Sequence, residues 1–407
     1  MYHVKSFDDV IKIIHANFSG FELESEVVNI KDAVNRITDD DIVAVEDIPG
    51  FNRSSVDGYA VIASDTFGSS EALPVQLKLL GEVKMGEKNY LTIASGQAAY
   101  IPTGGELPQN ADAVVMIEYS EDMDDGFVYI YKPVAPGNNV VFKGDDVKAG
   151  DVVLKSGSSL RPQDIGVLAA LGIEKVAVKR KIRVGIVSTG DEVVDIRQQP
   201  VGSQVRDVNS YFLYSGLLEY SVEPILYGIT ADSYKKIKTV VETALEECDV
   251  VLISGGSSVG TRDETYKIIN SVGDPGVLIH GIAVKPGKPT IIGKSGRKAL
   301  IGLPGHPVSA FFIFKLLVLR LIDVMNGTTS RPESTVKAVM TVNYPSNNGR
   351  EEFVPVILKK EGSGFFAEPV FSKSGLIKLL SSADGYVRVE RGSEGICKGC
   401  EVDVILF

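Results

Sequence analysis

A loop rich in glycine and serine, at residues 254–260, is the segment of this chain best suited to bind an anion. It follows the apolar run 250–253, which is typical of a buried strand, and a helix-like segment comes next at 265–272. In a parallel α/β sheet, such a loop brings backbone N–H groups and the positive end of the next helix close to a phosphate. The residues expected to form this cradle are Ser254, Gly255, Gly256, Ser257, Ser258 and Gly260.

The loop differs from the two common phosphate-binding motifs. It has neither the Gly-Lys-Ser/Thr of a Walker A motif nor the GxGxxG spacing of a dinucleotide-binding turn. A plain tight turn is the alternative, but this loop is longer than the usual strand-to-helix connection of roughly 2–6 residues. Its composition therefore indicates phosphate chemistry of a less common kind.

Three other polar loops, at 188–192, 228–232 and 303–307, also follow predicted strands. Ligands bind beyond the carboxyl ends of the strands in an open α/β sheet, so these loops should meet at one edge. Glu192, Asp232 and Asp263 would supply oxygen ligands for a hydrated Mg²⁺. Lys285 and Lys288, at the end of another predicted strand, would offset the charge of a bound anion.

Simpler explanations stay open for the individual residues. Asp232 and Asp263 each precede a predicted helix, where a carboxylate commonly caps free N–H groups. His306 is expected to be a hydrogen-bonded structural histidine. Cys397 and Cys400 form a single CxxC, which supplies two of the four ligands of a structural zinc, so we expect a turn with two thiols.

A second group of polar loops lies outside the predicted α/β segment, at 54–60, 101–105 and 143–146. Each of these loops taken alone is ordinary turn chemistry. Whether this group meets the first one depends on the fold.

The alternation of strand-like and helix-like segments over residues 182–327 predicts a doubly wound, mostly parallel α/β domain. Strands are expected at 182–188, 222–227, 250–254, 277–284 and 299–303. Helices are expected at 210–218, 233–247, 265–272 and 308–325.

The segments before and after the predicted α/β domain have a different residue pattern. Short β runs at 59–62, 75–80, 98–101, 113–118 and 127–131 predict a β-rich domain. Residues 330–407 predict a small β-barrel or sandwich with a possible turn near Leu376. Further helices are expected at 1–16 and 161–171.

Composition limits the class of protein. A chain of 407 residues should divide into several domains, and its formal net charge of −11 argues against nucleic-acid or anionic-membrane binding. The apolar stretch 307–325 is interrupted by Lys315, Arg320 and Asp323, which favours a buried helix over a membrane span. Three cysteines and an amphipathic N-terminus without signal-peptide character predict a cytoplasmic protein.

Several motifs in series resemble the MoeA family, the molybdopterin molybdenumtransferases, to which the E domain of gephyrin also belongs. The motifs are FNRSSVDGYAV (51–61), IPTGGELPQNADAVVMIE (101–118), STGDE (188–192), SGGSSVGTRDET (254–265), KPGKP (285–289) and LPGHPVSA (303–310). They occur in the family's order over nearly the whole chain.

The resemblance implies four domains and a homodimer. An elongated domain would comprise 1–45 and 145–180, with a β-rich domain inserted at 46–144. The α/β domain would span 181–327 and a C-terminal β-barrel 328–407. The active site would lie between the α/β domain of one subunit and the β-rich domain of the other.

The implied reaction is the insertion of molybdate into adenylated molybdopterin, with Mg²⁺-dependent loss of AMP. Carboxylates and Mg²⁺ would hold the pyrophosphate while lysines offset the charge of the two anions. The family's functional positions map onto Asp57, Thr103, Asp146, Glu192, Asp232, Asp263, Lys285 and Lys288, with Asp145 as an alternative to Asp146. Ligand-binding positions map onto Thr189, Gly190, Pro304, Gly305 and Pro307 and, by looser motifs, onto Arg350 and Ser382. The chain departs from the family at His306, where the family usually has Asn.

Two other functions remain as alternatives. The α/β segment also resembles the adenylyltransferases that make adenylated molybdopterin, although the flanking domains favour the insertion step. A scaffold protein, by analogy with gephyrin, would be expected to show an extended linker or a basic tail, and we find neither in the sequence. The residues do not distinguish molybdate from tungstate, and other cofactor-biosynthesis enzymes are conceivable partners.

Overall fold

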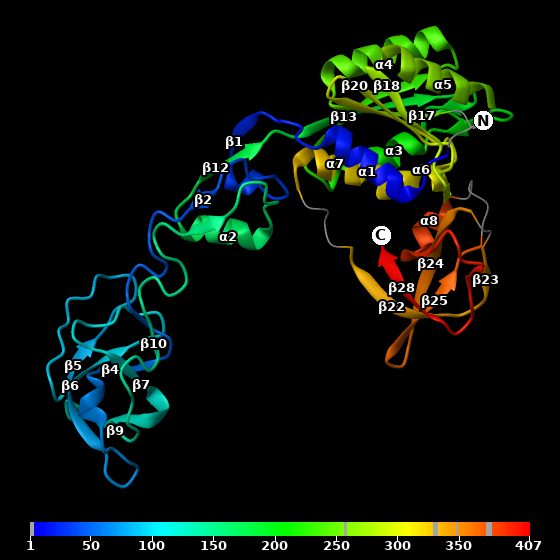
Figure 1. The fold of residues 1–407 in the computed structure, drawn as a ribbon. Helices are drawn as coiled ribbons and strands as arrows, with labels where there is room; N and C mark the ends of the chain where they lie inside the picture. The colour runs from blue at the N-terminus through cyan, green and yellow to red at the C-terminus, as the bar shows by residue number, and fades with distance from the viewer. Residues whose placement is uncertain (1–3, 256–258, 329–332, 347–348, 372–376) are drawn as a thin grey trace.

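The computed structural model describes residues 4–255, 259–328, 333–346, 349–371 and 377–407. The molecule is extended (Figure 1). A β-rich unit lies at one end, a narrow connecting unit follows, and an α/β unit with a C-terminal barrel beside it forms the other end (Figure 1).

The α/β unit is built on a sheet of six strands in the order β16-β13-β17-β21-β20-β18. β16 (Val222–Thr230), β13 (Ile182–Thr189), β17 (Val250–Gly255) and β21 (Lys298–Leu303) run parallel, as the alternating pattern predicts. β20 (Ile291–Ser295) and β18 (Pro275–His280) complete the sheet as antiparallel strands.

Two expectations for this region are wrong. The strand expected at 277–284 is two strands, because Gly281 has a φ of 93° and turns the chain between β18 and β19 (Val284–Lys285). β19 joins the C-terminal sheet instead. β20 was not expected, because its short run of two isoleucines before Gly293 gives little pattern on its own.

Helices cover both faces of the sheet. α3 (Asn209–Leu218), α6 (Pro307–Ile313), α7 (Leu319–Asn326) and the N-terminal α1 (Phe7–Phe18) share one core with Val250 and Leu252 of β17. α4 (Tyr234–Glu247) and α5 (Val259–Val272) share the other core with Val251 and Ile253. α5 begins six residues before the expected start at Thr265, because residues 261–264 are all compatible with a helix.

The apolar stretch at 307–325 is a buried helical segment, as predicted. A π-helical turn, Phe314–Val318, joins α6 to α7, and Phe312, Leu317 and Leu321 are fully buried. Within the described ranges, no helix has both the length and the apolar character that crossing a membrane requires.

The β-rich unit is a six-stranded sheet in the order β7-β4-β6-β5-β9-β8. All five predicted β runs form strands: β4 (Gly58–Val61), β5 (Val75–Glu82), β6 (Gln97–Ile101), β7 (Ala113–Met116) and β9 (Phe127–Ile130), with β8 (Ser120–Asp122) added at the edge. Its core consists of two apolar clusters, one of which contains Val115 and the other Val114. The short pair β3 (Arg53–Ser54) and β10 (Val140–Val141) lies beside them.

The connecting unit is formed by the two chain segments that precede and follow the β-rich unit in the sequence. β1 (Ser25–Asn29) pairs with β12 (Lys175–Lys179), and β2 (Ile42–Val43) pairs with β11 (Val152–Leu154), both antiparallel. α2 (Pro162–Ala170) packs its Leu168 into a small core with Leu160 and Val178.

The C-terminal region is a closed barrel, as predicted. Its order is β24-β25-β22-β28-β26, and β26 pairs back with β24 to close the ring. The strands are β22 (Thr335–Met340), β24 (Glu351–Glu361), β25 (Gly364–Pro369), β26 (Gly385–Val389) and β28 (Glu401–Leu406). β23 (Tyr344–Pro345) pairs with β27 (Gly395–Ile396), and α8 spans Lys378–Ser382. The turn expected near Leu376 lies outside the described residues.

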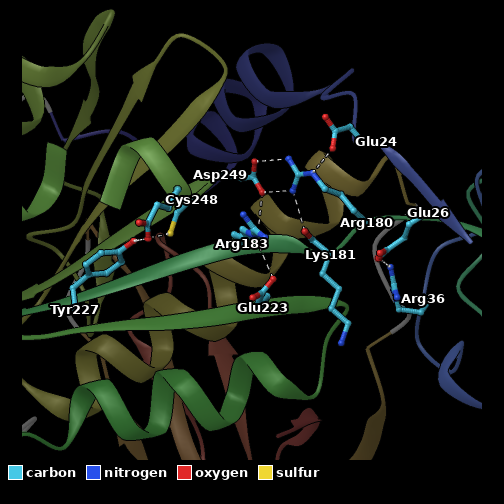
Figure 2. A network of polar contacts seen from close by, with 11 residues as sticks. Glu24, Glu26, Arg36, Arg180, Lys181, Arg183, Glu223, Tyr227, Cys248 and Asp249 are labelled. Carbon is cyan, nitrogen blue, oxygen red and sulfur yellow. Dashed lines mark hydrogen bonds and ion pairs between the residues drawn. The ribbon is translucent and has the colours of Figure 1, made fainter. Parts of the chain in front are cut away.

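A polar network joins the connecting unit to the α/β sheet at the amino ends of its strands (Figure 2). The two terminal nitrogens of Arg180, between β12 and β13, donate to the two carboxylate oxygens of Asp249 at 2.8 and 2.9 Å. The Arg183 backbone N–H donates to the same carboxylate at 2.8 Å. Asp249 is buried, so this pairing fixes where the chain enters the sheet.

Candidate functional site

The four parallel strands of the α/β sheet end at one edge, and the predicted polar loops follow them there. A cavity of about 510 Å³ opens at this edge. Its walls include Ser188, Thr189, Glu192, Ser254, Gly255, Gly305, His306 and Pro307. The structure therefore brings together residues from the carboxyl ends of β13 and β17 and from the loops after β13 and β21, as the parallel topology requires.

Backbone segments approach each other closely in this cavity wall. A Cβ placed on Gly255 would lie 1.6 Å from Thr189 Oγ1, so a larger residue would displace the Thr189 side chain. Gly190 has a φ of 144°, which an L-residue with a side chain rarely adopts. Glycine at 255 lets the ends of β13 and β17 lie close together, and glycine at 190 allows the backbone conformation of the turn after β13.

An acidic cluster lies beside the cavity. Burial raises the pKa of Asp232, and the negative charges of Glu192 and Asp191 raise it further. The Asp232 backbone N–H donates to Asp191 Oδ1 at 3.0 Å. Asp232 Oδ1 and Glu264 Oε2 are buried, and neither has a hydrogen-bond partner among the described residues.

Capping does not explain Asp232. The residue that precedes α4 is Ser233, and no side-chain capping bond is present at this helix start. The capping alternative for Asp232 is therefore wrong. Asp263 lies inside α5, which begins at Val259, so it does not precede the helix and the capping alternative is wrong there too; its side-chain contacts lie outside the described part of the structure.

Sequence reasoning missed several residues at this edge. Asn209, at the start of α3, donates from its side-chain nitrogen to Ser254 Oγ and to Gly305 O, both at 2.9 Å, and so ties two loops together. Arg206 and Asp207 also line the cavity. The signal was weak because these residues precede a helix instead of following a strand of the sheet. Glu264 was missed because the helix was expected to begin after it.

The second group of polar loops lies in the β-rich unit. The Thr103 backbone N–H and hydroxyl both donate to Asp57 Oδ1, at 2.7 and 3.0 Å. Asp145 accepts a hydrogen bond from the Phe142 backbone N–H, which gives it a turn-forming role, while Asp146 is exposed. Within one chain, the β-rich unit lies at the far end of the molecule from the α/β sheet (Figure 1). The two groups do not meet within a single chain.

Of the two motif lysines, Lys285 contacts the C-terminal region. Lys285 Nζ lies 3.2 and 3.1 Å from the two carboxylate oxygens of Glu352. Lys288 is exposed. The loop between them packs on α6, since a Cβ on Gly287 would lie 2.4 Å from Ile313 Cδ1. Neither lysine is part of the cavity wall.

The remaining expected residues are spread more widely. Arg350 is exposed, and the Ser382 hydroxyl donates to Lys378 O on α8. Pro304 follows β21 and precedes the cavity residue Gly305. Gly260 lies on α5, whereas Gly256, Ser257 and Ser258 lie outside the described residues.

The cysteines and His306 add no metal cluster. Cys397 and Cys400 are free and exposed at a turn in which the Cys400 N–H donates to Cys397 O at 3.2 Å. His306 precedes α6 without capping it. Across the described ranges, no group of three or more His, Cys, Asp or Glu side chains is arranged to hold a metal ion.

Comparison with known proteins gives consistent matches along the chain. Residues 5–172 match the model of the MoeA N-terminal region (domain I and II). Residues 185–323 match a probable molybdopterin binding domain, and 337–407 match the MoeA C-terminal region (domain IV).

Individual relatives match over nearly their full length. A Methanocaldococcus jannaschii protein named for molybdopterin biosynthesis is 39% identical over 93% of this chain and 92% of its own. The molybdopterin molybdenumtransferase of Bacillus subtilis is 30% identical over 94% of this chain and 90% of its own. A solved MoeA structure from Pyrococcus horikoshii OT3 superimposes with a TM-score of 0.85 at 34% identity, covering 99% of this chain and 100% of that one.

The motifs, the closed C-terminal barrel, the loops at the sheet edge and these full-length matches agree: the chain belongs to the MoeA family of transferases.

Proposed function

We propose that this protein inserts molybdate into adenylated molybdopterin, with Mg²⁺-dependent release of AMP. The observation that carries the proposal is the pair of buried, unpartnered oxygens, Asp232 Oδ1 and Glu264 Oε2, beside the cavity at the sheet edge. Burial and neighbouring carboxylates raise the pKa of Asp232, which is the environment that a cation relieves. A pyrophosphate-binding cavity beside a cation site fits an adenylated substrate.

The carboxylates that we propose at this edge have the ligand chemistry that suits Mg²⁺. Carboxylate oxygens are its preferred protein ligands, and it commonly uses one or two carboxylates together with substrate phosphates. We propose Glu192, Asp232 and Asp263 as its holders, with Glu264 as an addition that the structure suggests. When bound, Mg²⁺ would neutralise charge on the pyrophosphate and polarise its bond to the leaving AMP.

The chain's own residues would orient the substrate. Gly255 lets β17 lie directly against Thr189, because a side chain there would collide with that residue. The hydroxyls of Thr189 and Ser254 lie in the cavity wall, where they can donate to phosphate oxygens. Asn209 holds Ser254 and the Gly305 backbone at a fixed separation. Lys285 and Lys288 would offset the charge of molybdate as it approaches the anionic substrate.

We propose further that the site is completed by a second subunit in a cytoplasmic homodimer. Asp57, Thr103 and Asp146 lie in or next to the β-rich unit, far from the cavity of the same chain (Figure 1). A symmetric pair of extended chains can bring each β-rich unit to the other's α/β sheet. The four-domain division given above is part of this proposal, and tungstate remains possible in place of molybdate.

The test supplies purified protein with adenylated molybdopterin, Mg²⁺ and molybdate, and follows AMP release and metal-bound cofactor. We expect AMP release that depends on both ions. Binding of the substrate without AMP release above background would refute the proposal. Consumption of ATP with free molybdopterin, with pyrophosphate as product, would instead support the adenylyltransferase alternative.

A further inference from the structure

We propose that Glu352 and Tyr344, both from the C-terminal region, position Lys285 for the reaction. This inference rests on the proposed function, in which Lys285 acts on the anionic substrates. The C-terminal region would then help to arrange the site indirectly. Both residues would act through Lys285 without touching substrate.

The contacts around Glu352 are specific. Its side chain is 2% exposed, whereas that of Lys285 is 50% exposed. The ammonium of Lys285 donates to both carboxylate oxygens, at 3.2 and 3.1 Å. The hydroxyl of Tyr344 donates to Glu352 Oε2 at 3.1 Å. The buried carboxylate therefore accepts hydrogen bonds from a half-exposed ammonium and from a partly buried phenol.

The backbone enforces this arrangement. β19 runs parallel to β24, and in this register Val284 lies opposite Glu351 and Lys285 lies opposite Glu352. On the other side of Lys285, Gly287 packs directly on Ile313 of α6. The segment that carries Lys285 thus lies between the barrel and the helix whose first residue, Pro307, lines the cavity.

Tyr344 is itself held in place. Its ring stacks on Phe371 with centroids 5.7 Å apart and an angle of 19° between the rings. Burial raises the pKa of Tyr344 to about 12, and the charge of Glu352 adds to the effect. The phenol therefore stays protonated at neutral pH and keeps donating to the carboxylate.

Positioning of the Lys285 ammonium and attraction of an anion are separate contributions to the reaction. A buried carboxylate fixes the ammonium geometrically but also cancels part of its charge, so Glu352 should not strengthen the simple attraction of an anion. Its contribution should appear in turnover, where misplacement of a reacting group by about 1 Å can cost on the order of 100-fold.

The experiment compares Glu352→Gln and Tyr344→Phe with Lys285→Ala in the full-length protein. The matched control is Glu401→Gln, which removes the acid of an exposed ion pair with Lys337 on the same barrel. We expect Glu352→Gln to lower kcat by roughly 10–100-fold, with the KM for molybdate nearly unchanged. Tyr344→Phe should give a smaller fall in kcat, and Glu401→Gln none.

The double variant Lys285→Ala, Glu352→Gln shows whether Glu352 acts through the lysine. If it does, the second substitution adds no further loss to that of Lys285→Ala. An additional independent loss would overturn the inference. If Glu352→Gln fails to fold, the Tyr344→Phe variant tests the positioning role, because it keeps the ion pair between Lys285 and Glu352. An unchanged kcat in Tyr344→Phe would then contradict that role.

The outcomes also separate this inference from the proposed function. Wild-type activity in Lys285→Ala would remove the lysine from the mechanism and overturn both assignments for it. Loss in Lys285→Ala with full activity in Glu352→Gln would overturn the positioning role alone. A readout independent of turnover is acetylation of Lys285 followed by peptide mass spectrometry, which should be faster in Glu352→Gln and unchanged in Glu401→Gln.

Discussion

Asp232 occupies an environment that opposes its charge. It is partly buried, three other carboxylates (Glu192, Asp191 and Glu264) raise its pKa, and one of its oxygens has no partner among the described residues. In the unfolded chain these neighbours are absent and the pKa is ordinary. The folded state without a cation therefore binds this proton more tightly than the unfolded state, and ionisation of Asp232 costs stability as the pH rises through the folded-state pKa.

We predict that Asp232→Asn raises the melting temperature of the metal-free protein at pH 7, by on the order of a few degrees. The gain should vanish below pH of about 4, where the unfolded-state carboxyl is also protonated. Activity should fall by about 100–1,000-fold, as for loss of a charge-stabilising group. Thermal melts from pH 3.5 to 8, with and without Mg²⁺, check the prediction. A variant less stable than wild type at pH 7 would contradict the assigned environment.

At this scale, the sequence predicted residues that follow strands better than residues that precede helices. Thr189, Glu192, Ser254 and Gly305 were found because the ends of parallel strands must share an edge. Asn209 and Glu264 were not, because a side chain near a helix start is usually explained by capping. Their importance depends on contacts with other loops, which no local pattern encodes.

At the scale of elements, hydrogen bonds anchor the α/β sheet to the connecting unit at the edge opposite the cavity. Asp249 accepts three hydrogen bonds, two from Arg180 and one from the Arg183 backbone. Arg183 also forms an ion pair with Glu223, but the side chains of both are about half exposed. The two ion pairs lie close together (Figure 2), and they differ in burial, so they allow a buried pair to be compared with an exposed one.

We predict that Asp249→Ala destabilises the protein by about 3–5 kcal/mol, because Arg180 and a backbone N–H lose their buried partner. Glu223→Gln should cost no more than about 1 kcal/mol, as for an exposed pair. Urea unfolding followed by circular dichroism measures both. Equal effects of the two substitutions would show that burial does not decide the strength of these pairs.

Element positions were predictable where the pattern was long. The parallel strands and α3, α4 and the 307–325 segment repeat their apolar residues over several turns or alternations. Gly281 and β20 were missed because a single positive φ and a five-residue strand leave almost no periodic signal. The pairing of β19 with the barrel is a long-range contact and has no local signal at all.

At the scale of the whole molecule, the two groups of polar loops lie at opposite ends of one chain (Figure 1). Asp57 and Thr103 are joined by two hydrogen bonds in the β-rich unit, and Glu192 lies at the sheet edge. The sequence predicted both groups but not their separation, because local patterns carry no information on the direction of the connecting unit.

We predict that two inactive variants complement each other when mixed. Asp57→Ala damages the β-rich unit, and Asp232→Asn damages the sheet edge. After subunit exchange, half of the dimers are mixed and each mixed dimer has one intact shared site, so about one quarter of wild-type activity should return. Activity of the mixture and its mass by light scattering are the measurements. No recovery despite proven exchange would place the whole site within one chain.

The antiparallel pair β2–β11 has a consequence for how this chain can be taken apart. The polypeptide leaves toward the β-rich unit and returns at adjacent points, and that unit has its own apolar clusters. The residues between Val43 and Val152 form a segment, called the cassette, that we expect to be removable as a unit. A short turn joining Val43 to Val152 closes a smaller loop at lower entropic cost and leaves the remaining cores intact. We expect the cassette to fold when grafted onto another hairpin, so that each half of the proposed site could be studied as a separate module.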